Sequence, residues 1–170
     1  MNHTASATRL CKRGFTLIEI LIVIGIIAVL AAIVIVAINP ARQFALARNS
    51  QRVSNVNAIL NAIGQNMADN KGIFTCVPTV ALPSSAKYIS STSGDVDLHA
   101  CVVPTYMPSM PIDPGNTVVL LGAATPIFTD ATHYQTGYQV LQDTNGRTTV
   151  CAPGGAESSV ANSTAICVTR

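Results

Sequence analysis

One carboxylate is unusual because of the residues that surround it. Glu19 is the only charged residue in an apolar run from Phe15 to Ile38. A carboxylate in such surroundings costs about 3 kcal/mol or more, and ionisable groups there usually pair with a second charged group. We therefore expect Glu19 either to meet a cationic partner or, if it lies at the level of lipid headgroups, to be solvated by water.

Residue types that carry out catalysis are sparse elsewhere. The histidines are His3, His99 and His133, and the chain has no nucleophile-elbow serine, zinc-protease motif or phosphate-binding glycine loop. His99 stands near Asp95 and Asp97, which are possible metal ligands, but a solvated loop is the favoured interpretation. We expect a protein that is not an enzyme and that holds no metal or cofactor.

The apolar run that contains Glu19 is long enough to cross a membrane. Its 24 residues would span about 36 Å as a helix, more than the roughly 30 Å of a hydrocarbon core. Arg9, Lys12 and Arg13 precede it without any acidic residue, which predicts a cytoplasmic N-terminus and an exported remainder. A secretory signal peptide is disfavoured, because its apolar core has only about 7–15 residues.

The residues around the start of this run form a recognisable motif. Residues 12–19 read Lys-Arg-Gly-Phe-Thr-Leu-Ile-Glu, which resembles the processing site of type IV prepilins and pseudopilins. In that family a membrane peptidase cuts after the glycine and methylates the new N-terminal phenylalanine. The resemblance implies a leader over residues 1–14 that ends at Gly14, with Phe15 as the first mature residue. Gly14 has no side chain to keep a protease from the backbone.

This processing would create the cation that Glu19 requires. The free amine of Phe15 lies about 6 Å from Glu19 along the axis, at the four-residue helical spacing. The amine of a neighbouring subunit is the favoured partner, because staggered helices would then be fixed in axial register. Ala28, Ala31 and Ala32 would allow close helix packing.

A second helical pattern follows Pro40, a residue that bends or ends helices. Apolar residues recur at spacings of seven, three and four, which predicts an amphipathic helix over residues 39–71 that stops at Asn70-Lys71-Gly72. Arg48 and Arg52 are expected on the other faces. The predicted apolar stripe consists of Leu46, Val53, Val56, Leu60, Ile63 and Met67.

The remainder, residues 72–170, contains all but one of the nine prolines and is expected to form strands and loops. Asn145-Gly146 between β-forming residues predicts a hairpin. The fold class is therefore α+β: a long N-terminal helix, with the membrane or filament-core half over residues 15–38, packed on a small antiparallel sheet. The predicted strands are Tyr138–Gln142, Arg147–Cys151, Thr117–Leu121 and an edge strand Ala165–Thr169, and Thr75–Pro114 is expected to form loops.

Cys11 falls in the leader, which leaves Cys76, Cys101, Cys151 and Cys167 in the exported part. Oxidising compartments favour disulfides, and four cysteines allow three pairings. We favour Cys76–Cys101 and Cys151–Cys167 because each closes a local loop, and the family resemblance supports the second pair. A zinc site is disfavoured, since no two cysteines lie roughly two to four residues apart.

Two short motifs are weaker. Residues 111–115, Pro-Ile-Asp-Pro-Gly, resemble the proline–aspartate loop of major pseudopilins, some of which bind calcium nearby. Calcium requires roughly six to eight oxygen ligands, so Asp113 in a plain turn is the favoured interpretation. Asn162-Ser163-Thr164 fits an N-glycosylation sequon.

Charge excludes one class of function. Only 11% of the residues are charged, and the formal net charge of +2 falls to −1 once the leader is removed, so no specific nucleic-acid partner is expected. The resemblance implies a structural subunit of a type IV pilus-like filament for adhesion, motility or DNA uptake.

Its partners would be the prepilin peptidase and N-methyltransferase, identical or related pilin subunits, and an inner-membrane assembly platform. The subunit would wait in the inner membrane as a single-pass protein and then enter an extracellular filament. The alternatives are a pseudopilin of a type II secretion or competence system, and a membrane-anchored extracytoplasmic binding domain that does not polymerise.

Overall fold

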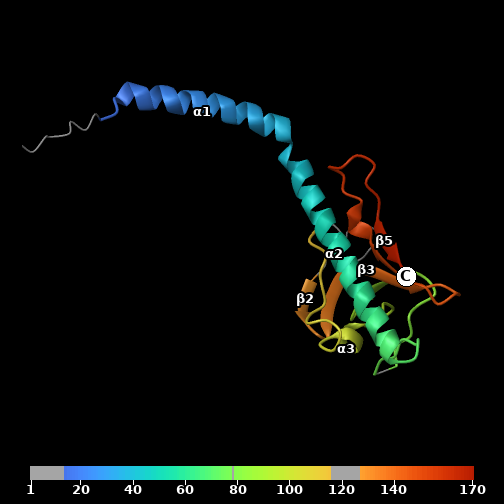
Figure 1. The fold of residues 1–170 in the computed structure, drawn as a ribbon. Helices are drawn as coiled ribbons and strands as arrows, with labels where there is room; N and C mark the ends of the chain where they lie inside the picture. The colour runs from blue at the N-terminus through green and yellow to red at the C-terminus, as the bar shows by residue number, and fades with distance from the viewer. Residues whose placement is uncertain (1–13, 78, 116–126) are drawn as a thin grey trace, which may run out of the picture. The chain divides into compact units, whose positions relative to one another are not determined.

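The computed structural model describes residues 14–77, 79–115 and 127–170. The chain divides into two compact units, residues 1–40 and 41–170. In the first unit, helix α1 spans Leu17–Ile38, within the predicted apolar run (Figure 1). Asn39 follows in the left-handed conformation at φ 47°, which ends the helix. The predicted leader falls on residues that lie, apart from Gly14, outside the described range.

Helix α2 spans Pro40–Asp69, so the predicted second helix is confirmed. Pro40 is its first residue, where the missing N–H needs no partner, so the proline starts a new helix rather than bending one. At the other end, the Gly72 N–H donates to the Met67 carbonyl at 2.7 Å. Lys71 and Gly72 both have positive φ. Glycine adopts this conformation without strain, so the end of the helix favours a glycine.

An antiparallel sheet forms the centre of the second unit. The predicted hairpin is confirmed: its strands pair from Gln142↔Thr148 to Gln139↔Cys151. The predicted edge strand is also confirmed and pairs with the second hairpin strand. The order is β1-β3-β4-β5, with β2 also paired to β3. The strands are β1 (Lys87–Ser90), β2 (Ile127–Asp130), β3 (His133–Gln142), β4 (Thr148–Ala152) and β5 (Ile166–Thr169).

Short elements account for most differences from the sequence prediction. Strand β1 and helix α3 (His99–Val102) lie in the stretch Thr75–Pro114 that was expected to form loops, and each has only four residues. Elements of this length show too little periodicity to be recognised. The predicted strand Thr117–Leu121 lies outside the described residues.

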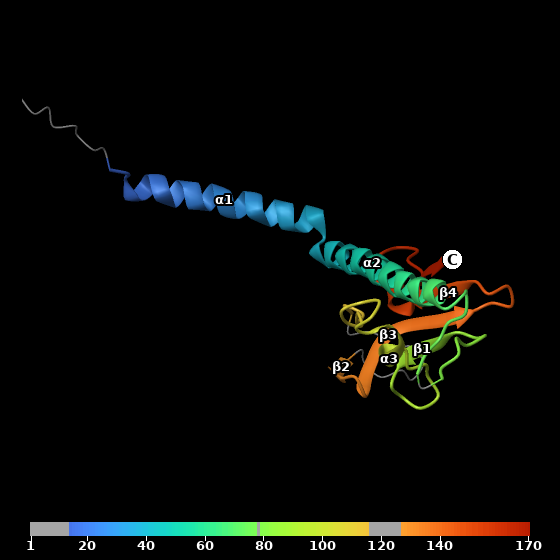
Figure 2. The same cartoon turned by 60° about the horizontal axis from the view of Figure 1, so that its bottom comes forward.

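The core forms where α2 packs on the sheet (Figure 2). Val56 and Ile59 of α2 are fully buried in the same cluster as Tyr138 and Val140 of β3. These contacts remove the apolar face of α2 from water, which is the main stabilising contribution to this unit.

The prediction of which residues of α2 form its buried apolar stripe is wrong in the N-terminal half of the helix. Leu46 and Val53 are 40% and 43% exposed, whereas Arg52, expected on another face, is completely buried. The buried face instead runs through Ala45 and Arg52 to Val56. A charged residue can occupy this face because acidic groups from other segments meet it there.

Candidate functional site

The N-terminus of α1 holds the residues of the predicted processing site. Thr16 is the N-cap, and its hydroxyl accepts a hydrogen bond from the Glu19 N–H at 3.3 Å. In return, Glu19 Oε2 accepts from the Thr16 N–H at 2.8 Å and from its hydroxyl at 2.9 Å. This capping box satisfies orphan donors of the first turn. Glu19 therefore has a partner within its own chain that the sequence analysis did not anticipate.

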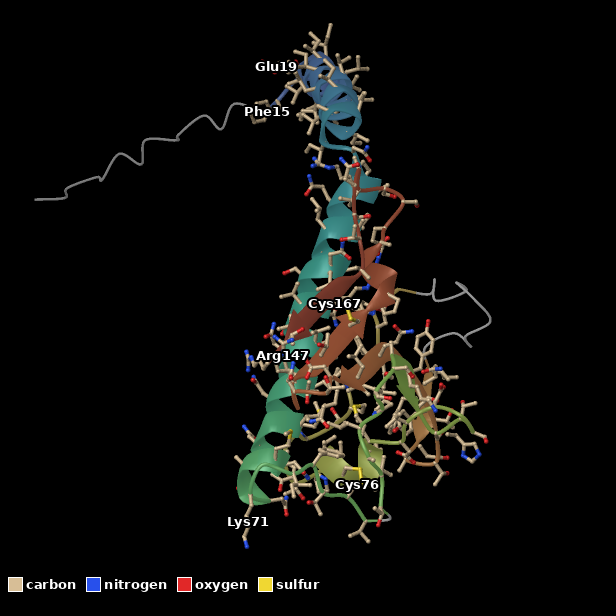
Figure 3. The ribbon with its side chains drawn as sticks, turned by 90° about the vertical axis from the view of Figure 1, so that its right-hand side faces the viewer. Phe15, Glu19, Lys71, Cys76, Arg147 and Cys167 are labelled. Carbon is tan, nitrogen blue, oxygen red and sulfur yellow. A yellow bond between two sulfur atoms is a disulfide. The ribbon has the colours of Figure 1, made fainter. Side chains whose placement is uncertain are left out.

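The geometry at Gly14 imposes no internal requirement for glycine. A Cβ added there would meet no atom within 4 Å, and Gly14 is not among the positive-φ residues. Phe15 follows it and is 83% exposed (Figure 3). The backbone between Gly14 and Phe15 is thus open to an enzyme, and any demand for glycine at this position comes from outside the chain.

Helix α1 presents apolar side chains on all sides. None of its residues is buried, and its large apolar side chains range from 50% exposed at Ile20 to 84% at Val36. Within the described parts of the chain, α1 is the one helix that is long and apolar enough to cross a membrane. A surface of this kind is stable only when lipid or other helices cover it.

A second cluster of charged residues fastens α2 to two distant segments of the head, the unit of residues 41–170. Arg52 donates from Nε to Asp113 Oδ2 at 2.7 Å and from Nη2 to Asp113 Oδ1 at 2.8 Å. Its Nη1 reaches Glu157 Oε1 at 2.6 Å. Arg48 binds the same Glu157 through two hydrogen bonds of 2.7 Å. The cluster of Arg48, Arg52, Asp113 and Glu157 is called the arginine clasp below.

The arginines of the clasp keep Glu157 ionised. Hydrogen bonds from Arg48, and then from Arg52, lower the pKa of Glu157 to about 2 against the effect of desolvation. Gly154 lets its backbone lie close to the Arg52–Asp113 ion pair, because a Cβ at this position would lie 3.0 Å from Asp113 Oδ2 and 3.1 Å from Arg52 Nη2. A buried charge of this kind is tolerated only with such complete pairing.

Asp113 is thus neither a plain turn residue nor available to calcium. Both of its oxygens are engaged by Arg52, and Oδ1 also accepts from the Gly115 N–H at 2.7 Å. Among the described residues no group of three or more histidine, cysteine, aspartate or glutamate side chains is arranged to hold a metal.

Sequence periodicity contained a signal for Arg52. It lies four residues before Val56 and seven before Ile59, which places it on the buried face of the helix. Its partners gave no such signal, because Asp113 and Glu157 are 61 and 105 residues away along the chain.

The histidine and its two aspartates serve packing in the structure. The His99 ring stacks on Phe128 with centroids 5.8 Å apart. The Tyr134 hydroxyl donates to Asp97 Oδ1 at 2.7 Å, and burial together with this bond raises the pKa of Tyr134. Asp95 accepts from the Ser90 hydroxyl at 2.6 Å.

Both predicted disulfides are present. Cys76–Cys101 joins the segment after α2 to α3, and its Cα atoms lie 4.8 Å apart. Cys151–Cys167 links directly paired residues of β4 and β5, with Cα atoms 4.1 Å apart. The second bridge fixes the edge strand to the sheet. In Asn162-Ser163-Thr164, Asn162 is exposed with a φ of 58°.

Comparison with known proteins agrees with the N-terminal geometry. Residues 9–35 match the family described as the prokaryotic N-terminal methylation motif. No curated protein and no solved structure matches the chain. The chain therefore carries the signature of type IV pilins and pseudopilins. This motif implies processing by a prepilin peptidase and pilin-like assembly, and with α1 it indicates a membrane-anchored protein.

Proposed function

We propose that this chain is the structural, non-catalytic subunit of a type IV pilus-like filament. The observation that carries the proposal is an apolar helix without any buried residue, α1, which begins two residues after the first mature residue implied by the methylation motif. Lipid covers this helix before assembly, and the helices of neighbouring subunits cover it afterwards. The filament would serve adhesion, motility or DNA uptake.

Processing at Gly14 prepares the subunit. The open backbone at Gly14 and Phe15 is accessible to the peptidase, and cleavage removes Arg9, Lys12 and Arg13. Because these residues hold the N-terminus at the cytoplasmic face, their loss eases extraction of α1 from the inner membrane by the assembly platform. The head, on the other side of the membrane, can then join an extracellular filament.

Glu19 would link one subunit to the next. All the hydrogen bonds that it receives from Thr16 end on Oε2. Oε1 can therefore accept from the Phe15 amine of a neighbouring subunit while the capping box stays intact. Such a pair neutralises both charges inside the apolar core of the filament and sets the axial register.

Two substitutions separate this pairing from helix capping. Glu19→Gln keeps a side chain that suits a capping box but removes the charge. Thr16→Val removes the capping hydroxyl but keeps the carboxylate. We expect Glu19→Gln to reduce the yield of sheared filaments about a hundredfold or more, since breaking a buried ion pair costs about 3–5 kcal/mol. Thr16→Val should still assemble.

The measurement is the amount of chain in the sheared filament fraction relative to the amount in membranes. Equal yields for the two variants would refute the pairing. A wild-type chain that is retained entirely in membranes would instead indicate an anchored domain that does not polymerise.

A pseudopilin of a type II secretion or competence system is the second candidate, because the methylation motif is common to both classes. Deletion of the gene distinguishes them. Loss of surface filaments with normal protein secretion supports the pilus subunit, and loss of secretion or DNA uptake while surface filaments remain supports the pseudopilin.

A further inference from the structure

A groove of about 530 Å³ lies between the C-terminal half of α2, the β3–β4 turn and the end of β5. Its apolar lining comes from α2, where the exposed Ala68 and the half-buried Met67 lie above the buried side chains of Leu60 and Ile63. Its lining also includes two arginines, Arg147 from the turn and Arg170 after β5. Figure 3 shows Arg147 beside α2. The groove thus combines an apolar floor with cationic groups.

The arginines are held in place without full neutralisation. Arg170 donates to Asn61 and to Asn57, and the second of these hydrogen bonds is 3.2 Å long. Both partners are neutral amides. Arg147 pairs with Asp143 at 2.8 Å and its side chain remains 64% exposed. Asp143 is therefore the one acidic side chain that the described contacts pair with either guanidinium group, which favours an acidic occupant.

The opposite end of β3 carries a surface of complementary character. Every residue of β2 is exposed, with Ile127 at 56% and Phe128 at 42%. Asp130 ends this strand, and its side chain is 54% exposed. Hydrogen bonds from the Thr132 hydroxyl and N–H, with a smaller contribution from His133, lower the pKa of Asp130 to about 2, so it is charged at neutral pH.

The two surfaces are separated by the length of one strand. Strand β3 runs from His133, beside β2, to Gln142, beside the turn that contributes Arg147. Ten residues extend about 30 Å at roughly 3.3 Å per residue. Figures 1 and 2 both show β2 and the β3–β4 turn at opposite ends of the sheet.

From this placement we infer that the β2 end of one head docks into the arginine-lined groove of a second copy of the chain. Ile127 and Phe128 lie on the apolar floor, and Asp130 pairs with Arg147 and Arg170. The two surfaces differ, so the contact is heterologous and repeats from copy to copy without needing to close. This inference rests on the proposed filament, and it adds a contact between heads to the packing of α1.

The test exchanges the charges in the full-length chain in its native host. Asp130→Arg and Arg170→Glu each place like charges across the contact, and each is expected to reduce the yield of sheared filaments about tenfold. The double variant again places opposite charges at positions 130 and 170 of neighbouring copies, although Arg147 is unchanged, and should recover part of the yield. Lys87→Glu, an exposed charge on β1 outside both surfaces, is the control and should leave the yield unchanged.

Folding of each variant is checked by its thermal transition, because Arg170 also binds α2. Among the described residues, the Asp130 side chain hydrogen-bonds within its own turn, to Thr132 and His133. Asp130→Arg therefore tests the inference even if Arg170→Glu unfolds. Wild-type yield in Asp130→Arg, or no recovery in a folded double variant, would overturn the docking while leaving the filament intact. Absence of filaments from the processed wild-type chain would instead refute the proposed function.

Discussion

The two long helices follow each other along the chain, with only Asn39 between them, yet they depend on different partners. Helix α1 has no buried residue, and its apolar side chains cover the whole circumference. Helix α2 buries one face against its own sheet and leaves the remainder to solvent. The contrast shows that α2 is stabilised within the chain, whereas α1 requires partners outside it.

The charged residues of the two helices also differ in where their partners lie along the chain. Among the described residues, Glu19 in α1 receives its side-chain hydrogen bonds from Thr16, three residues away. Arg52 in α2 is surrounded by carboxylates from segments remote in sequence. The Arg52 charge is neutralised within the head, and we propose that the Glu19 charge is neutralised by a neighbouring subunit.

The largest expected effect comes from separating the helices. A fragment of residues 41–170 contains the entire buried core and both disulfides. We expect it to be soluble without detergent and to unfold in a single cooperative transition, whereas the full-length chain requires detergent or lipid. Circular dichroism and sedimentation measure both properties. A fragment that is unfolded or aggregated would show that the head depends on α1.

The next effect concerns the arginine clasp. Arg52→Ala leaves Asp113 buried without its cation, and we expect the free energy of unfolding of the fragment to fall by about 3–5 kcal/mol. Denaturant unfolding measures the change. The matched control is Arg147→Ala, which breaks an exposed ion pair with Asp143 and should have no measurable effect. Similar losses for the two variants would contradict the role assigned to the clasp.

A smaller effect is expected from pH. Because the folded-state pKa of Glu157 lies at about 2, below its ordinary value of 4.5, the ionised form stabilises the fold at higher pH. This contribution is complete above about pH 4.5 and is lost as the pH falls toward 2. Melting temperatures of the fragment and its Glu157→Gln variant should therefore converge over this range. A constant difference between them down to pH 2 would show that the Glu157 charge is not responsible.

Sequence reasoning succeeded where a signal is local. The apolar run, the processing motif, the Asn145-Gly146 hairpin and the two short-range disulfides all follow from residues close together in the chain. It failed where the structure joins remote residues. The arginine clasp needs α2, Asp113 and Glu157 to meet, and only the fold brings them together. The short elements β1 and β2 likewise take their stability from pairing with β3.

The capping box at Thr16 is a local feature, yet it was not predicted from the sequence. A threonine followed three residues later by glutamate is a local pattern for a helix start. In the sequence Glu19 stands out as an ionisable group in an apolar run, and the hydrogen bonds between this residue and its own helix were not predicted. The proposed subunit pairing is compatible with this capping, because the Thr16 hydrogen bonds end on Oε2 and the pairing would use Oε1.

The account depends most on a mature chain that begins at Phe15, just before α1, and that keeps this helix. Mass analysis of the N-terminal peptide, from protein purified out of its native host, tests this claim most directly. We predict a chain that begins at Phe15 and carries a methyl group on its α-amine. A chain that begins at Met1, or one that begins beyond Ile38 and so lacks α1, would contradict the account.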